Sequence, residues 1–271
     1  MPLSSSALVS LPDLKQYLGT TVRTDDAILE ACIERASGAV ERYCARKFGQ
    51  TRYWEWHDGN EAGRLRLRQA PTIVVRAVLT GSQSLMTVRS TLSSDAFSSV
   101  SVREDRLVLH RMSSTGASTT TEILFSQYET VTEVAAQANA VTGFAASSLL
   151  DAPARHLRRF AGRELRNSTA YLEGPTDSLV DYVVDVDTGV LFGSFPSGDQ
   201  TILVDYTAGY ERIPDDVKQA TLMVAANYYR DRQRDMGIQS ESLGGYSYSR
   251  RSADETRAAM ADILVGWRTI R

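Results

Sequence analysis

The sequence predicts an α+β protein with a mainly α-helical bundle core, a small antiparallel β element, and an inserted subdomain that is β-rich or mixed. Three stretches have the apolar spacing of amphipathic helices, and shorter stretches between them alternate apolar and polar residues. From about residue 82 to residue 181 the chain becomes rich in Ser and Thr, with short strand-like pieces. We therefore expect a core made of residues 1–81 and 182–271, and an insertion subdomain at 82–181 whose role the sequence does not indicate.

The composition is that of a folded protein with no strong overall charge. The chain has 271 residues, 42% of them hydrophobic and 23% charged, and this length suits one large domain or two small ones. The formal net charge is −3, so the chain lacks the broad positive field of proteins that bind nucleic acid by neutralising phosphates. No run approaches the roughly 18 apolar residues that a membrane-spanning helix needs.

The two cysteines, Cys32 and Cys44, are not expected to form a disulfide. On one helix they would lie about 18 Å apart, at a rise of about 1.5 Å per residue, which is too far for a bridge. We expect both to be small buried residues in a protein of a reducing compartment.

Two helices are expected near the N-terminus. Residues 10–19 have the cap and stop signals of a short helix. Residues 24–49 form a longer one, with Thr24 as its expected cap and Gly49 as its end. An apolar stripe recurs along this second helix at intervals of three and four residues: Leu29, Ile33, Ala36, Val40 and Tyr43.

Strand-like segments follow at residues 51–56, 64–68 and 72–79. Trp54 and Trp56 fall on the same side of the first of these strands, because side chains alternate along a strand. They form a broad apolar surface that another part of the protein, or a partner, must cover.

The Ser/Thr-rich region contains short strands at residues 106–110 and 122–126 and a helix at 128–141. Residues 152–165 are predicted to be either a second helix or a basic loop. The expected helix at 128–141 has one apolar face, made of Val131, Val134, Ala135 and Ala138.

After residue 181 the pattern of the core resumes. Residues 181–192 predict a hairpin, 200–210 a strand and 213–233 a third strong helix. The last helix spans 252–271 and begins with a Ser252–Glu255 capping box. Its buried face is expected to comprise Met260, Ile263, Leu264 and Trp267.

No arrangement of residues indicates catalysis, a cofactor or a metal. The three histidines, His57, His110 and His156, are not spaced as metal ligands, and no nucleophile-elbow or phosphate-binding motif is present. The acidic pairs at 25–26 and 215–216 lie in the first turns of predicted helices, where the helix dipole favours negative charge. We therefore expect that the protein is not an enzyme.

A local group of arginines occurs in the predicted insertion. It would either form a solvated helix face, which we favour, or contact DNA or an acidic protein surface. Its members are Arg155, Arg158, Arg159, Arg163 and Arg166.

The polar segment at residues 236–252, between the last two helices, is the best candidate for a site of contact. Its tyrosines alternate with serines as in a strand, and its glycines allow bends at little steric cost. Such a strip can pair with a sheet edge while its tyrosines fill pockets. We predict a docking arm for another protein chain, with an unpartnered loop as the alternative. The predicted contact residues are Gly237, Ile238, Ser240, Glu241, Ser242, Leu243, Gly244, Gly245, Tyr246, Ser247, Tyr248 and Ser249.

Several segments, in their order along the chain, resemble the head–tail connector proteins of long-tailed double-stranded DNA phages, also called adaptor or head-completion proteins. They are "LPDLKQYLG", "DDAILEACIERASGAVERYCARKFG", "LRLRQAP", "VDYTAGYERIPDDVKQATLMVAANYYRDR" and "GIQSESLGGYSYS". The most specific are "YTAGY", with the "IP" that follows it, and the "SESLGGYSYS" strip. The resemblance covers about residues 1–81 and 182–271, and typical members lack the residues between.

The resemblance implies a structural virion protein without a cofactor, located in the head–tail neck and assembled in the host cytoplasm. Such proteins form a ring, usually of twelve subunits, that joins the portal vertex of the filled head to the next connector, stopper or tail protein. DNA passes through the ring without sequence-specific binding.

Two other functions stay open from the sequence. One is a different neck or tail-side component, such as a terminator ring. The less favoured one is an enzyme with its site in the insertion, built from Asp151, His156 and Arg159. A deep pocket on which these three side chains converge would distinguish it.

Overall fold

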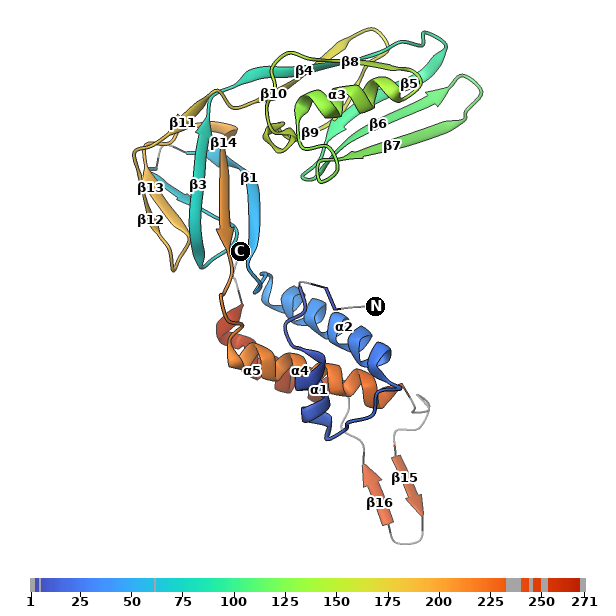
Figure 1. Cartoon of the computed structure of the whole chain (residues 1–271), viewed down its shortest axis with the longest axis vertical. Coiled ribbons are helices and arrows are strands. Elements are labelled where there is room, and N and C mark those ends of the chain that lie inside the picture. The colour runs from blue at the N-terminus through green and yellow to red at the C-terminus, as the bar shows by residue number, and fades with distance from the viewer. Residues whose placement is uncertain are drawn as a thin grey trace. The chain divides into compact units, whose positions relative to one another are not determined.

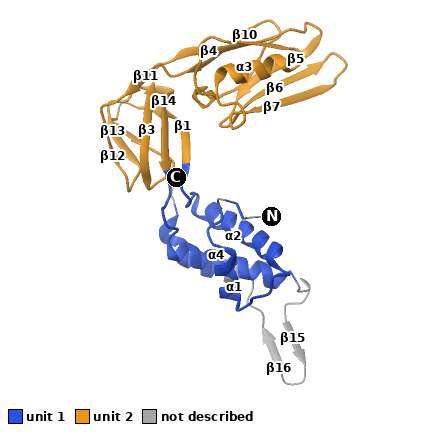
Figure 2. Cartoon of the chain, viewed as in Figure 1, with its two compact units in different colours: residues 1–51, 208–271 blue, residues 52–207 orange. Residues whose placement is uncertain are grey.

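The computed structural model of the chain describes residues 3–4, 6–60, 62–232, 240–243, 246–249 and 253–268, of which residues 240–257 are described by their backbone alone. The chain divides into two compact units: unit 1 consists of residues 1–51 and 208–271, and unit 2 of residues 52–207 (Figure 2). Unit 2 is wider than the insertion predicted at 82–181. The insertion boundaries concern the relation to shorter proteins and stay a prediction.

Unit 1 is a group of packed helices. It contains α1 (Leu11–Leu18), α2 (Asp26–Cys44), α4 (Asp215–Asp231) and α5 (Ala253–Leu264), with a 3-10 turn at Val265–Trp267. Helix α4 contacts α1, α2 and α5 (Figure 1). The predicted apolar stripes meet in one core, whose fully buried members include Leu14, Leu29, Ile33, Ala36, Val40, Cys44, Val217, Ala220, Ala225 and Leu264.

Both ends of the predicted helix at 24–49 are wrong. Asp25 is the N-cap residue, and the Thr24 hydroxyl donates to the Asp25 carboxylate instead of accepting from the backbone. The helix ends at Ala45, which has a φ of 53°, and not at Gly49. Gly49 is instead bridged to Tyr210 as a short parallel pair, so the chain must leave the helix before it.

Unit 2 is built mainly of β-sheet (Figure 1). One sheet has the strand order β1-β14-β3-β11, a second β12-β13-β2, a third β10-β4-β8 and a fourth β7-β6-β5-β9. The strands are β1 (Thr51–Gly59), β2 (Arg64–Arg66), β3 (Thr72–Thr80), β4 (Gln83–Ser90), β5 (Asp95–Val102), β6 (Arg106–Ser113), β7 (Ser118–Leu124), β8 (Phe144–Ser148), β9 (Phe160–Glu164), β10 (Thr169–Gly174), β11 (Asp177–Leu179), β12 (Tyr182–Asp185), β13 (Val190–Gly193) and β14 (Gly198–Ala208).

The fold class predicted from the sequence, with a mainly helical bundle core, is wrong. Strands contain 39% of the residues and helices 28%, in several antiparallel sheets. The Ser/Thr-rich segments account for much of the difference, because residues 83–90 and 95–102 form regular strands although their alternation of apolar and polar residues is weak. Pairing with neighbouring strands stabilises them where local sequence pattern does not.

One large core of unit 2 lies among β4, β5, β6, β8, β10 and the helix α3 (Val131–Ala140). Helix α3 contacts β8, β4 and β7, and its predicted apolar face of Val131, Val134, Ala135 and Ala138 is buried. Residues 152–165, predicted to be either a second helix or a basic loop, form neither of these along their whole length. A single 3-10 turn at Ala154–His156 is followed by β9, which pairs antiparallel with β5.

Among the residues that the structure describes, no helix is long and apolar enough to cross a membrane.

Candidate functional site

The predicted docking arm begins at the end of α4, which is tied to the start of α2. The Tyr229 hydroxyl donates to the Asp25 carboxylate, and Arg232 Nη2 donates to Asp25 Oδ2 at 2.7 Å. These hydrogen bonds from Tyr229 and Arg232 hold the pKa of Asp25 below its usual range. The Arg232 guanidinium also stacks on Tyr229, 4.0 Å from the ring centroid. The last turn of α4 is thereby held in place.

The described part of the arm is a two-stranded antiparallel hairpin. Strand β15 (Ser240–Leu243) pairs with β16 (Tyr246–Ser249), Ser240 facing Ser249 and Leu243 facing Tyr246. Among the described strands, the hairpin pairs only with itself. Its backbone can therefore offer sheet edges to another chain.

Eight of the predicted contact residues lie in this hairpin, and four lie outside the described residues: Gly237, Ile238, Gly244 and Gly245. Their contact with a portal protein or a neighbouring subunit stays a prediction.

The segment after the arm returns to the core of unit 1. Met260 and Leu264 of α5 are buried there, as predicted. The Trp267 ring lies edge-on to the rings of Phe48 and Tyr210, at centroid distances of 6.1 and 5.7 Å. Both the helix before the arm and the helix after it are thus part of one packed body, and α4 contacts α5.

The "YTAGY" motif has a structural reason at its glycine. Gly209 has a φ of +123°, and a Cβ there would lie 2.4 Å from the carbonyl oxygen of Gly49. The next residue, Tyr210, donates its backbone N–H to the Phe48 carbonyl at 2.8 Å and stacks on the Phe48 ring. The motif therefore sets how the chain segment before unit 2 meets the chain segment after it.

The residues proposed for an enzymatic site in the insertion are not brought together. Asp151 and His156 both line a cavity of about 670 Å³, whereas Arg159 lines a different hollow and pairs with Glu104 at 3.1 Å. Burial lowers the pKa of His156. The Asp151 carboxylate accepts a hydrogen bond from the Thr132 hydroxyl at 2.8 Å. The three side chains do not converge as the enzymatic alternative required.

The arginine group covers the tryptophan surface of β1. The guanidinium of Arg155 lies 4.5 Å from the centroid of the Trp54 ring, and Arg52 lies 4.3 Å from the same centroid. Arg158 lies 5.3 Å from the Trp56 centroid, and the Trp56 indole N–H donates to the Leu157 carbonyl at 3.2 Å. The surface predicted to need a cover is thus covered within unit 2.

Several arginines of this group also form ion pairs with glutamates. Arg158 lies 3.3 Å from Glu173, and Arg166 lies 2.5 Å from Glu164. The segment is neither the solvated helix face that the sequence favoured nor an unpaired basic patch.

The sequence pattern missed a second exposed surface, on the sheet β12-β13-β2. Val183 of β12 faces Phe192 of β13, which in turn faces Arg64 of β2. In the next row Asp185 faces Val190, and Val190 faces Arg66. The alternation in residues 181–192 predicted the hairpin, but only the sheet shows which residues share a face.

The model of the family described as "Head completion protein" matches residues 167–268. This part of the chain is similar to the head completion proteins. The resemblance inferred from the sequence is confirmed there.

The head completion protein match includes "YTAGY", α4, the hairpin β15–β16 and α5. It does not include α1, α2 or the first strands. The family is one of structural proteins and not of enzymes, in agreement with the expectation from the sequence.

Chains from three solved particles resemble the whole chain weakly. They are described as "Neck of empty GTA particle computed with C6 symmetry" (TM-score 0.43, 14% identity), "Neck of native GTA particle computed with C12 symmetry" (0.39, 15%) and "Virion of native gene transfer agent (GTA) particle" (0.37, 16%). Each alignment covers 100% of this chain, and 94%, 93% and 94% of the other chain. Scores this low do not establish a shared fold. No curated protein matches the sequence.

Proposed function

We propose that this protein is a ring-forming component of the neck of a tailed, phage-like particle. In this role it joins the portal vertex of the filled head to the next connector, stopper or tail protein, and DNA passes through the ring. The family match at residues 167–268 is the observation that carries the proposal.

The build of unit 1 supports a role in contact with other chains. The hairpin β15–β16 extends from two helices that are themselves packed into one core. A hairpin whose edges pair with no other described strand suits β-sheet addition to a neighbouring subunit or to the portal. A closed ring needs a head-to-tail interface of this kind, in which different surfaces of identical subunits meet.

The charge of the chain suits a DNA conduit that does not retain DNA. A net charge of −3 gives no general attraction for phosphates. We expect the ring to contact DNA without reading its sequence.

Deletion of residues 238–249 tests the role of the arm. Particles assembled with the deleted protein should contain packaged DNA but fail to acquire tails, as seen by electron microscopy of the particle necks. The matched control is Tyr171→Ser, which removes an exposed aromatic side chain in unit 2. If the deleted protein still gives tailed particles at the normal frequency, the arm is not the docking element.

A further inference from the structure

The outer face of the sheet β12-β13-β2 carries an apolar strip between opposite charges. Residues directly opposite each other in an antiparallel sheet share a face, so the two rows Val183–Phe192–Arg64 and Asp185–Val190–Arg66 lie on the same side. Across this face, β12 contributes a carboxylate, β13 contributes apolar side chains and β2 contributes two guanidinium groups.

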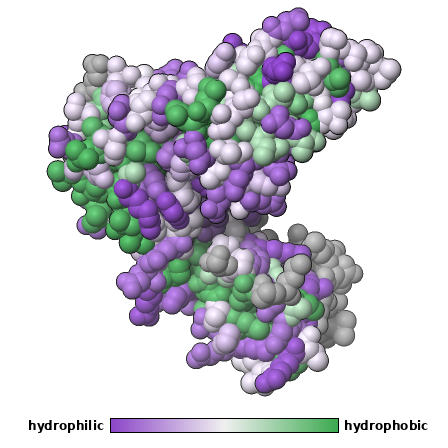
Figure 3. All heavy atoms as spheres, turned by 45° about the horizontal axis from the view of Figure 1, so that its top comes forward, coloured by the Kyte–Doolittle hydropathy of each residue, from purple (hydrophilic) through white to green (hydrophobic). Residues whose placement is uncertain are grey.

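This face is exposed, whereas the reverse face is buried. Val183 is 69% exposed and Phe192 is 41% exposed, while Leu65 and Leu191 on the other side are 6% and 0% exposed. Figure 3 shows apolar atoms gathered at the left of the view, over this part of unit 2. Contiguous apolar surface with a polar rim marks interaction sites in proteins.

The charged residues of the face have positions suited to pairing with another chain. Among the described residues neither Arg64 nor Arg66 makes an ion pair, and the Arg64 guanidinium lies 5.8 Å from the centroid of Phe192. The Asp185 carboxylate accepts hydrogen bonds from the backbone of Asp187 and Thr188, which fix its position at the turn after β12. These contacts leave a fixed negative charge on one side of the strip and two arginines without an acidic partner on the other.

The acidic, apolar and basic side chains follow one another from β12 through β13 to β2, and this order makes the face complementary to itself. When two such faces are laid together about a two-fold axis parallel to the strands, left and right are exchanged between the copies. The apolar side chains of β13 in one copy then meet those of β13 in the other copy. The acidic side of each copy, at β12, meets the basic side of the other, at β2. Only an arrangement with the two charges on opposite sides of the apolar strip gives this result.

We propose that this face binds the same face of a second copy of the chain, so that free subunits form isologous pairs in solution. Such a pair covers Val183 and Phe192, which would otherwise face water, and opposes Asp185 of each copy to Arg66 of the other. The proposed interface belongs to unit 2, whereas the hairpin arm belongs to unit 1. It masks the apolar face until the subunit is incorporated.

Charge reversal in the full-length protein tests this proposal by sedimentation equilibrium. Arg66→Glu and Asp185→Lys should each weaken self-association by about tenfold or more, because each places like charges opposite one another in both halves of the pair. An equimolar mixture of the two variants should recover the affinity of the unaltered protein, since every charge pair is then opposite in sign. The control is Asp216→Lys, an exposed change on α4 that should have no effect.

One further variant and a check of folding keep the test decisive. Phe192→Ser should weaken association without changing any charge, and circular dichroism should show that all variants are folded. The proposal is overturned if the unaltered protein stays monomeric, if the single reversals associate normally, or if mixing them restores nothing. Failure to restore would mean that Asp185 and Arg66 do not oppose each other between the two copies. Tailing of particles by the same variants, measured separately, reports on the neck function and not on the pair.

Discussion

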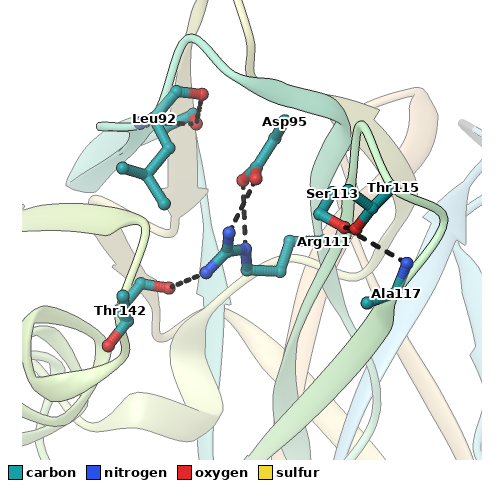
Figure 4. A network of polar contacts seen from close by, with 8 residues as sticks. Leu92, Asp95, Arg111, Ser113, Thr115, Ala117 and Thr142 are labelled. Carbon is teal, nitrogen blue, oxygen red and sulfur yellow. Dashed lines mark hydrogen bonds and ion pairs between the residues drawn. The ribbon is translucent and has the colours of Figure 1, made fainter.

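The side chain of Arg111 on β6 is joined to the carboxylate of Asp95 at the start of β5 by two hydrogen bonds. Nη2 donates to Oδ1 at 2.7 Å and Nε to Oδ2 at 3.0 Å, and Nη1 donates to the Thr142 carbonyl at 3.3 Å (Figure 4). The Asp95 side chain is only 1% exposed. This forked pair links two neighbouring strands to the loop after α3, within the core of unit 2.

Replacement of Arg111 by Met is expected to destabilise unit 2, because it leaves the buried Asp95 carboxylate without its cationic partner. We expect a loss of about 3 kcal/mol in the free energy of unfolding, measured by urea denaturation. Arg106→Met is the matched control, since Arg106 pairs with Asp105 and Glu122 at the surface, and we expect it to cost clearly less than Arg111→Met. Equal losses of stability in the two variants would contradict the conclusion that the buried Asp95 carboxylate depends on Arg111.

The Tyr206–Glu55 hydrogen bond predicts a pH-dependent stability. Burial alone would raise the pKa of Glu55, but the nearby His57 ring, whose Nε2 lies 3.4 Å from Glu55 Oε2, and the hydrogen bond from the Tyr206 hydroxyl, at 2.8 Å, outweigh burial and lower the pKa. A carboxyl with a lowered pKa in the folded state stabilises the fold above its unfolded pKa of about 4.3, and this stabilisation is lost as the pH falls through the folded value.

Tyr206→Phe should therefore cost about 2 kcal/mol at neutral pH, as expected for a hydrogen bond to a charged group. The difference from the unaltered protein should shrink as the pH falls through the lowered pKa of Glu55, because only below that value is the carboxyl neutral in both proteins. Denaturation curves collected between neutral and acidic pH measure this. Tyr171→Phe, at a tyrosine that is 57% exposed, should show no such dependence, and a pH-independent cost for Tyr206→Phe would contradict the role of Glu55.

Cys44 is expected to resist alkylation in the folded protein. Burial raises the pKa of its thiol to about 11, so the thiolate is rare at pH 8, and the side chain is fully buried. Mass spectrometry after treatment with iodoacetamide should show no modification of Cys44 in the native protein and full modification in guanidinium chloride. Rapid labelling under native conditions would mean that α2 opens readily at its C-terminal end.

Asp25→Asn is expected to loosen the last turn of α4. The amide of Asn cannot provide the charge that Tyr229 and Arg232 share at Asp25, so the anchor before the hairpin weakens. Hydrogen–deuterium exchange should become faster at the backbone amides of residues 228–232 and stay unchanged in α1. Asp216→Asn, at the exposed start of α4, serves as the control. Unchanged exchange at residues 228–232 would show that packing alone holds this turn.

The sequence by itself determined the helices of unit 1 and the tight hairpin at 182–193. An amphipathic helix can be predicted from the spacing of its own apolar residues. Leu29, Ile33 and Val40 therefore identify the buried face of α2 without any knowledge of the partner helix. The hairpin of β12 and β13 has its turn signal between the strands, and its register follows from it. The motif "YTAGY" could be recognised in the sequence, but its glycine is required by the approach of Gly49 from a distant part of the chain, which only the structure shows.

Only the tertiary structure decided the β-sheets of unit 2 and the surfaces that they expose. Strand β9 exists because residues 160–164 pair with β5, some sixty residues earlier in the chain, and the arginines around it read locally as helix or loop. Arg64 and Phe192 come to lie side by side only through the pairing of β2 with β13. The apolar periodicity within one segment is enough to predict a helix. A sheet depends on which strands pair, and the sequence of one strand does not identify its partner.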